Sequence, residues 1–414
     1  MGRRKKPTEP ICGFCGLPRS QVGILVEGKV PGALICANCS LISVKIVEKE
    51  KEQQPQQHQE KAAFAQVPTP KQIVSFLDQY VIGQNSAKKV LAVGVYNHYK
   101  RLISQRVEDD DPTEVEKSNI LWIGPTGSGK TLLAKSVARM LNVPFAIGDA
   151  TVLTEAGYVG EDVESLLLKL LHAADMRQDL AECGIIYIDE IDKIARSQGN
   201  VSITRDVSGE GVQQALLKML EGKICNVPPG GGRKHPEQKY IAVDTSNVLF
   251  ICGGTFVGLK DIIGRRIGKN AMGFGSVQNN IDNDKILEQA VSDDLVEFGM
   301  IPELIGRLPI ISSLMELTED ELMKVLTEPR NALVRQYKKL FRMEGSELEF
   351  TNDALREVVQ LARKKGTGAR GLRSILENVM LDVMYALPEQ RKGQYTITKK
   401  VVTGEEGLFG KEAA

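Results

Sequence analysis

The sequence has no excess of charge of either sign, because its 53 Lys and Arg residues equal its 53 Asp and Glu residues. This balance gives no support to nucleic acid or an anionic membrane surface as a partner. No uninterrupted apolar run approaches the ~20 residues that span a bilayer, and no apolar segment follows the basic residues 3–6. We therefore predict a cytoplasmic protein, and its length suits roughly two or three domains.

Cysteine is also scarce, because seven residues among 414 do not suggest a disulfide scaffold. Four of them instead form two CxxC pairs, Cys12 with Cys15 and Cys36 with Cys39, with 20 residues between the pairs. This spacing is typical of a structural Zn²⁺ site, in which four thiolates leave no open coordination position. The alternative, two separate redox pairs, lacks the βαβ pattern expected around such a motif. We predict a zinc module over residues 1–50 that docks proteins such as adaptors or forms dimers.

A complete P-loop pattern, GxxxxGK[ST], occupies residues 124–131. The apolar segment 119–123 predicts a buried strand before it, and apolar residues spaced four apart predict a helix over 131–141. Glycines let backbone N–H groups approach phosphate oxygens, and the helix N-terminus favours anions, so the alternative of an empty glycine-rich turn is the weaker one. We predict that Lys130 reaches the β- and γ-phosphates of ATP and that the Thr131 hydroxyl binds Mg²⁺. The predicted phosphate-binding residues are Gly124, Pro125, Thr126, Gly127, Ser128, Gly129, Lys130, Thr131 and Leu132.

The apolar segment 184–188 leads into two acidic residues, Asp189 and Glu190. The segment predicts a buried strand, and ligands of open α/β sheets bind at the carboxyl ends of their strands. We predict that Asp189 holds Mg²⁺ and that Glu190 polarises the attacking water as a general base. A strand that ends in a solvated acidic turn is the alternative, and the P-loop upstream weighs against it.

Several other segments resemble motifs of AAA+ ATPases. Val81 and Ile82, upstream of the P-loop, resemble the segment that packs on adenine. Arg370, in the sequence Gly-Ala-Arg, resembles the sensor-2 residue that contacts the nucleotide from a small second domain, although Arg373 is an alternative structural partner.

Two further positions follow from the same resemblance. Arg307, at the end of segment 299–307, resembles the arginine finger that a neighbouring subunit offers to the charged transition state. AAA+ proteins usually place a polar sensor at the end of a third strand. Here that strand, predicted at 247–252, runs into Gly253 and Gly254, so that Thr255 is the nearest candidate.

Tyr158 and Val159 lie between two glycines, in a segment between the P-loop and the acidic strand. An aromatic side chain on a glycine-hinged loop offers a large contact area at low entropic cost, so it can grip a polypeptide without sequence preference. A loop tyrosine that packs onto its own subunit is the alternative.

Together with the cysteine pairs and segments 203–211 and 232–236, these motifs resemble the ClpX family, the ATP-dependent AAA+ unfoldases of the Clp protease. The resemblance covers residues 12 to about 387. It implies that Tyr158 and Val159 form the pore loop that pulls substrate, and that a second pore loop lies near 196–205. It also implies substrate attraction at the channel entrance by Arg233, Lys234 and His235, and docking on the ClpP peptidase by Met272, Gly273 and Phe274.

The resemblance implies an α/β fold, with a doubly wound P-loop AAA+ domain over 68–316 and a small, mainly helical domain over 317–400. The Lys/Glu/Gln-rich composition that begins near Glu48 predicts a flexible linker, placed at 51–67, and residues 401–414 form a tail. Helices are predicted over 318–343 and 351–365 and from 368 onward. The implied assembly is a homo-hexamer that uses ATP and Mg²⁺ to unfold tagged proteins and deliver them to ClpP, without cutting peptide bonds itself.

Two other functions stay open at this point. A nucleic-acid-remodelling AAA+ ATPase with a zinc reader module is disfavoured by the zero net charge and by the Tyr158–Val159 loop. A related AAA+ unfoldase that serves a different peptidase is disfavoured by the four-cysteine module and by the tripeptide at Met272–Phe274.

Overall fold

The computed structural model describes residues 9–28, 32–53, 67–105, 113–154, 161–196, 209–228, 240–270 and 285–409. Residue contacts divide the chain into two compact units, 1–66 and 67–414, which are considered separately below. Four predicted segments lie outside the described residues: the second pore loop beyond residue 196, and Tyr158–Val159, Arg233–His235 and Met272–Phe274. No helix in the described part is both long and apolar enough to cross a membrane.

The first unit is a small module around the cysteine pairs. Its described elements are α1 (Arg19–Val22), the antiparallel strands β1 (Leu25–Glu27) and β2 (Leu34–Cys36), and α2 (Ala37–Gln53). Of the hydrophobic side chains described in this unit, Cys12 and Cys36 alone are buried. So small a core is expected of a module whose stability depends on a bound metal.

Helix α2 continues to Gln53, through residues 48–53 that the composition assigned to a flexible linker. Residues 48–53 are therefore helical, and the rest of the predicted linker, 54–66, lies outside the described residues. Low apolar content prevents a segment from forming a core, but Glu and Lys have high helix propensity. A helix whose first turns are already anchored can extend through them at little cost.

The second unit is built on a sheet of five parallel strands, in the order β11-β3-β10-β7-β4. This order places β10 between β3, which enters the P-loop, and β7, which ends at Asp189. Residues 120–123 and 185–188 are completely buried, as expected where helices cover both faces of a parallel sheet. The predicted doubly wound α/β fold is confirmed. The strands are β3 (Ile120–Ile123), β4 (Phe145–Asp149), β7 (Ile185–Asp189), β10 (Leu249–Gly254) and β11 (Ile310–Ser313).

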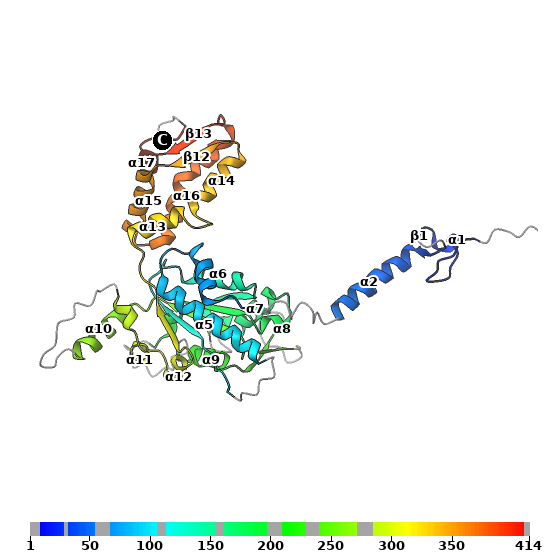
Figure 1. The fold of residues 1–414 in the computed structure, drawn as a ribbon, viewed down its shortest axis with the longest axis horizontal. Helices are drawn as coiled ribbons and strands as arrows, with labels where there is room; N and C mark the ends of the chain where they lie inside the picture. Colours follow the sequence, from blue (N-terminus) through cyan, green and yellow to red (C-terminus); the bar gives the residue numbers. More distant parts are fainter. Residues whose placement is uncertain are drawn as a thin grey trace, which may run out of the picture. The chain divides into compact units, whose positions relative to one another are not determined.

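Helices surround this sheet, and Figure 1 shows α5, α6 and α7 beside its strands. One hydrophobic cluster joins the strands to the helices that follow them, through residues such as Leu170, Leu216, Phe250 and Leu304. The helices are α4 (Pro70–Asp78), α5 (Asn85–Ser104), α6 (Lys130–Leu141), α7 (Ser165–Ala173), α8 (Gln178–Ala181), α9 (Glu210–Leu220), α10 (Leu259–Asn270), α11 (Ser292–Phe298) and α12 (Pro302–Gly306). Two short strand pairs are β5 (Leu153–Thr154) with β6 (Glu161–Asp162), and β8 (Ile224–Val227) with β9 (Ile241–Asp244).

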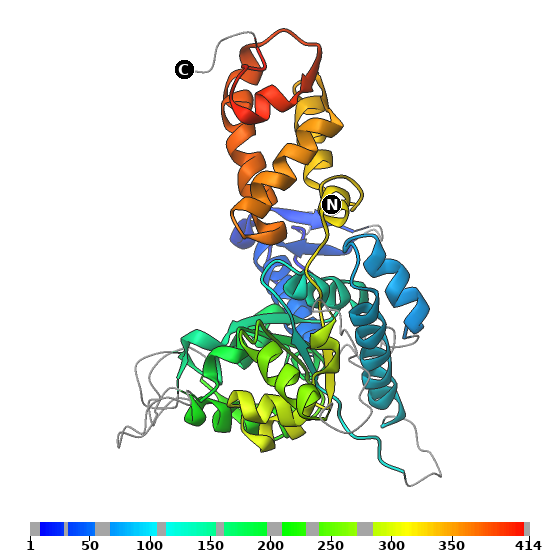
Figure 2. The same ribbon diagram turned by 90° about the vertical axis from the view of Figure 1, so that its left-hand side faces the viewer.

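The C-terminal elements, coloured from yellow to red in Figures 1 and 2, lie together and share a separate hydrophobic cluster. The predicted helix over 318–343 is in fact two helices. Pro329 lies between them, where its ring and missing N–H group cannot continue a helix. The elements are α13 (Glu319–Thr327), α14 (Leu333–Met343), α15 (Asn352–Lys364), α16 (Gly368–Ala386), α17 (Lys399–Thr403), and the parallel strands β12 (Glu347–Phe350) and β13 (Gln394–Ile397).

Candidate nucleotide and metal sites

The P-loop connects the end of β3 to the start of α6. Gly127 and Gly129 have φ values of 84° and 99°, in the left-handed region that side chains with a Cβ rarely adopt. Gly124 is equally constrained, because an added Cβ would lie 2.5 Å from the carbonyl oxygen of Leu314. These glycines therefore maintain a loop conformation that brings backbone N–H groups to the N-terminus of α6.

The donors of this loop fit a polyphosphate. The Lys130 side chain is only 7% exposed, and its Nζ donates to the carbonyl oxygens of Gly124 at 2.7 Å and Pro125 at 3.0 Å. Burial lowers the pKa of the Lys130 ammonium below its ordinary value of 10.5, so a bound anion would stabilise its charged form. The Ser128 hydroxyl is buried without a hydrogen-bond partner in the described part of the chain. A buried cation, an unsatisfied hydroxyl and a helix N-terminus together suit the phosphates of ATP.

Thr131 and Asp189 meet where the start of α6 faces the end of β7. Thr131 Oγ1 donates to Asp189 Oδ2 at 3.1 Å. The other oxygen, Asp189 Oδ1, accepts from the Tyr187 hydroxyl at 3.1 Å and from the Glu190 N–H at 3.0 Å. Hydroxyl and carboxylate oxygens are ligands that Mg²⁺ prefers, so this pair fits the ion predicted for it.

Glu190 follows Asp189 with a φ of 55°, a left-handed conformation that is uncommon for residues other than glycine. Such strained conformations concentrate at functional sites, where the surrounding structure maintains them. The negative charge of Glu190 also raises the pKa of Lys130, although burial, the larger effect, lowers it. The predicted general base therefore lies within electrostatic reach of the P-loop lysine.

Val81 and Ile82 lie just before α5. Val81 is buried beside the P-loop, where a Cβ on Gly129 would lie 3.7 Å from Val81 Cγ1, and Ile82 is half-buried. Lys88, buried in α5, secures this segment, because its Nζ donates to the Val81 carbonyl and to Asp78 Oδ1, both at 2.6 Å. Sequence reasoning missed Lys88, since a lysine in the first turns of a helix is usually solvated.

The start of α16 lies against the P-loop. A Cβ on Gly127 would lie 3.1 Å from the backbone nitrogen of Ala369, and one on Gly368 would lie 3.2 Å from the carbonyl oxygen of Thr126. Glycine at both positions permits this close approach. The helix that carries Arg370 is thus brought to the phosphate-binding loop.

Arg370 and Arg373 are distinguished by their neighbours. Besides burial, the larger effect, the charge of Arg370 lowers the pKa of Lys130. Arg373 Nε instead donates to Glu377, one turn along the same helix, at 2.9 Å. Arg370 is therefore the better candidate for the sensor-2 role, and Arg373 has a local partner.

The four cysteines of the first unit converge, with all four Sγ atoms within 4.8 Å of one another. Backbone N–H groups, that of Cys15 foremost, lower the pKa of the Cys12 thiol to about 6. Hydrogen bonding with Cys36 and the other thiols raises the pKa of Cys39 to about 12. So many thiols cannot all ionise at this separation without a cation, and a set of four sulfur donors fits Zn²⁺.

Comparisons with known proteins cover most of the chain. Residues 115–311 match the AAA domain (Cdc48 subfamily), and residues 317–401 match the C-terminal D2-small domain of ClpB protein. The ATP-dependent Clp protease ATP-binding subunit ClpX from each of two strains of Porphyromonas gingivalis is 52% identical over 397 residues. The alignment covers 95% of this chain and 96% of each relative. The chain belongs to the ClpX family.

Membership of the ClpX family confirms the resemblance inferred from the motifs, together with the AAA+ fold. It also confirms that the chain is an ATPase rather than a peptidase. An ATPase of this class uses ATP with Mg²⁺, for which the P-loop, Thr131 and Asp189 are the fitting groups.

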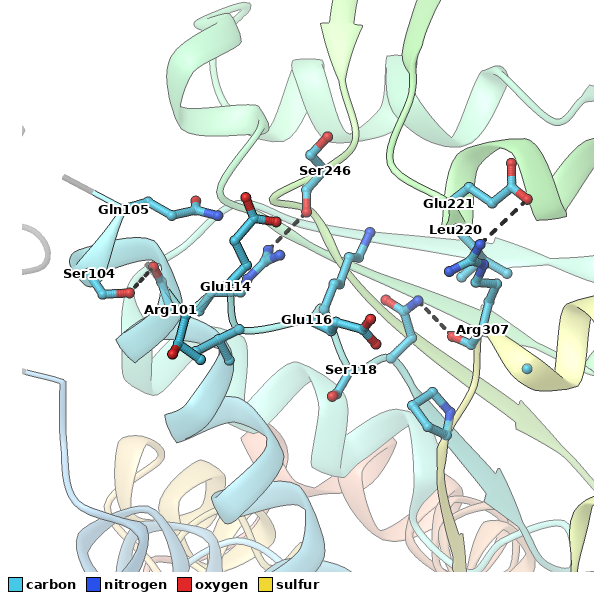
Figure 3. A pocket seen from close by; sticks show the side chains of 16 residues that line it. Arg101, Ser104, Gln105, Glu114, Glu116, Ser118, Leu220, Glu221, Ser246 and Arg307 are labelled. Atoms are coloured by element: carbon cyan, nitrogen blue, oxygen red, sulfur yellow. Dashed lines mark hydrogen bonds and ion pairs between the residues drawn. The ribbon is translucent and has the colours of Figure 1, made fainter. Parts of the chain in front are cut away.

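Arg307 lies at the end of α12, beside a hollow of about 950 Å³ (Figure 3). Its side chain is 54% exposed, and its Nη2 is 3.9 Å from Glu221 Oε1, a contact too long to restrain it strongly. Among the described residues, none that lines the hollow belongs to the P-loop. The arginine is therefore available to a group outside its own chain.

Sequence reasoning missed Asn119, which positions the backbone of Arg307. This buried side chain donates from Nδ2 to the Arg307 carbonyl oxygen at 2.9 Å, and its Oδ1 accepts from the Phe250 N–H at 3.3 Å. It thereby joins β3 and β10 to the end of α12. The available signal was one polar residue at the start of an otherwise apolar strand.

Thr255 does follow β10, as the strand pattern predicts, and it interacts with Asp192. Its N–H and its hydroxyl donate to the two carboxylate oxygens of Asp192, each at 3.0 Å. Asp192 is buried in the turn after Glu190, and the sequence offered no reason to single it out. The Thr255 hydroxyl thus donates to a residue two positions after Glu190, the predicted general base.

Loss of the zinc site is expected to unfold the first unit. In the Cys36→Ser variant of the full chain, three thiolates remain, and zinc binding that contributes ~10–16 kcal/mol in zinc-finger peptides is greatly weakened. We expect loss of bound zinc, measured by atomic absorption, and rapid proteolysis within residues 9–53. ATP hydrolysis should persist, because the second unit has its own core. Cys225→Ser is the matched control, and a zinc-free variant that resisted proteolysis would contradict the assignment.

Proposed function

We propose that this chain is an ATP-dependent protein unfoldase and translocase. It would assemble as a homo-hexamer in the cytoplasm, unfold tagged proteins and deliver them to the ClpP peptidase. Its parts would be the zinc module (1–50), a linker (51–67), the large and small AAA+ domains (68–316 and 317–400) and a tail (401–414). The observation that supports assembly into an oligomer is that Arg307 is exposed and lies beside a hollow that no residue of its own P-loop lines, among the described residues.

Each ATP site would form at a seam between two protomers. One protomer provides the P-loop with Lys130, the Mg²⁺ ligands Thr131 and Asp189, and the general base Glu190. The neighbouring protomer provides Arg307. This division is supported by the hydrogen bond that joins Thr131 to Asp189 and by the separate surroundings of Arg307. When bound, Mg²⁺ neutralises charge on the phosphates, and the finger would stabilise the charge that remains.

Arg370 would couple the site to the small domain. Its helix α16 begins against the P-loop and extends into the C-terminal hydrophobic cluster, through Leu372 and Leu376. A change in the phosphates that Arg370 contacts would therefore act on a rigid element of the small domain. Rotation between the two domains is the movement that would pull a threaded chain.

The residues that handle the substrate rest on the family resemblance. Tyr158 and Val159 would grip the polypeptide in the pore, and Arg233, Lys234 and His235 would attract it at the entrance. Met272, Gly273 and Phe274 would dock on ClpP, with Met in place of the commoner Ile or Leu as a volume-conserving change.

The zinc module would bind adaptors or substrates, or pair with another copy. Apolar side chains on its surface support a docking role, because Ile24, Val26 and Leu41 are all more than half exposed.

The direct test is ATP-dependent loss of fluorescence from a folded, tagged reporter protein, measured with and without ClpP. We expect loss of fluorescence with ATP alone and degradation of the reporter only when ClpP is added. A chain that stayed monomeric with nucleotide, or that left the reporter folded, would refute the proposal. Stimulation of ATP hydrolysis by single-stranded DNA and not by unfolded tagged protein would favour the nucleic-acid-remodelling alternative.

Tyr158→Ala should separate ATP hydrolysis from protein unfolding. We expect near-normal ATP hydrolysis, because Tyr158 is not among the residues proposed to bind nucleotide, together with at least ~10-fold slower unfolding of the reporter, since an aromatic anchor is lost. Tyr158→Phe is the control, because it keeps the ring and should retain unfolding. Normal unfolding by Tyr158→Ala would remove the grip role.

A further inference from the structure

Tyr187 occupies space that the neighbouring strand leaves open for it. Its ring is completely buried, with its centroid 6.2 Å from that of Trp122. At Gly253 on β10, an added Cβ would overlap the Tyr187 hydroxyl and lie 3.1 Å from two of its ring carbons. The absence of a side chain at Gly253 is therefore what allows the phenol hydroxyl to reach the carboxyl end of β7.

At that end, the hydroxyl holds one edge of the Asp189 carboxylate. Asp189 Oδ1 accepts two hydrogen bonds, from the Tyr187 hydroxyl and the Glu190 N–H, while Oδ2 accepts one from Thr131 Oγ1. Two donors on Oδ1 and one on Oδ2 define the rotation of the carboxylate about its last torsion. Without the phenol, Oδ1 would retain a single backbone donor, and the carboxylate would sample a wider range of orientations.

We propose that Tyr187 is a positioning residue of the nucleotide site, which orients Asp189 so that Oδ2 and Thr131 Oγ1 face a common divalent cation. The inference rests on the proposed ATPase site. The polar group next along β10, the Thr255 hydroxyl, donates to Asp192 instead. Tyr187 therefore supplies, from β7, the neutral donor that Gly253 and Gly254 cannot supply from β10.

The experiment compares nucleotide affinity with and without metal. The dissociation constant of a fluorescent, non-hydrolysable ATP analogue is measured in EDTA and in Mg²⁺, and the ratio of the two reports how strongly the protein and the metal cooperate. In the Tyr187→Phe variant we expect this ratio to fall about 10-fold, because loss of a group that hydrogen-bonds to a metal ligand commonly weakens metal binding by roughly that factor. The dissociation constant in EDTA should stay unchanged. A buried tyrosine with a merely structural role would lower the unfolding temperature and leave the ratio as it was.

Tyr99→Phe is the matched control. Tyr99 is also buried, and its hydroxyl donates to a backbone carbonyl, that of Cys183, at 3.1 Å. It should lose a similar amount of stability and keep the wild-type ratio. Emission from Trp122, the one tryptophan of the sequence, reports whether packing beside Tyr187 is intact. Gly253→Ala gives an independent test, because the added methyl group displaces the hydroxyl while keeping it in the protein.

The outcomes separate this inference from the proposed function. A reduced ratio in Tyr187→Phe or Gly253→Ala, with Tyr99→Phe unchanged, supports the positioning role. An unchanged ratio in a folded Tyr187→Phe variant overturns it and leaves the ATPase assignment intact. A wild-type chain whose nucleotide affinity does not depend on Mg²⁺ would overturn both.

Discussion

Glu190→Gln is expected to bind ATP normally and to hydrolyse it at least ~10²-fold more slowly than the wild type. Glu190 comes directly after the Mg²⁺ candidate Asp189, and its charge acts on Lys130. The amide has the size of the carboxylate and preserves the strained turn, but it cannot accept a proton from water. Binding and hydrolysis should therefore separate, and the variant should accumulate as an ATP-bound complex.

Two measurements check this expectation. Phosphate release gives the turnover rate, and retention of labelled ATP on the purified chain gives occupancy. Glu357→Gln is the matched control, because it removes the charge of a carboxylate on α15 that pairs with Lys399 of α17 at 3.0 Å. Near-normal turnover by Glu190→Gln would refute the assignment of Glu190 as the general base. Loss of ATP binding would show instead that Glu190 contributes to nucleotide affinity.

The second large effect is expected from Arg307→Ala. An arginine finger contributes ~10³–10⁵ in rate where it has been measured, so we expect hydrolysis to fall by at least ~10³-fold. Nucleotide binding should change little, because Arg307 is exposed beside the hollow of Figure 3 rather than at the P-loop. Arg265→Ala is the matched control, since that exposed arginine pairs with Glu297 on the surface at 2.9 Å.

Mixing the two inactive variants tests whether Arg307 acts across a seam. Arg307→Ala chains retain an intact P-loop and Glu190, and Glu190→Gln chains retain an intact finger. In a random equal mixture, about a quarter of the seams in a cyclic homo-oligomer would combine the intact halves. Recovery of ATP hydrolysis on mixing supports the shared site, whereas a mixture as inactive as its components would show that the finger acts within one chain.

The parts of the site that the sequence revealed are contiguous in the chain. The P-loop was recognisable because close approach to phosphates demands glycine at particular positions, and Gly127 and Gly129 do have the backbone angles that other residues avoid. The acidic pair was recognisable because it ends a predicted buried strand downstream of a P-loop, where a phosphate-bound Mg²⁺ needs a carboxylate. The cysteine pairs were recognisable because tetrahedral metal geometry requires their spacing.

Predictions of helices and linkers from composition and apolar spacing were less reliable where helix propensity or a proline acted on the same short segment. Helix α2 extends into the predicted linker, because helix propensity does not require a core. The predicted helix at 318–343 is divided at Pro329, a breaker that the apolar periodicity on either side concealed.

The sequence by itself determined the family and the fold class and indicated the chemical groups proposed to handle phosphate, because each is encoded in short motifs with strict steric or coordination requirements. The tertiary structure alone decided which side chains orient those groups. Asn119 meets the carbonyl of Arg307 across 188 positions, and Tyr187 reaches Asp189 because Gly253 of another strand makes room for it. Such hydrogen-bond partners depend on packing between strands that are distant in the sequence. A polar residue in an apolar segment therefore does not indicate which atom it will hydrogen-bond to.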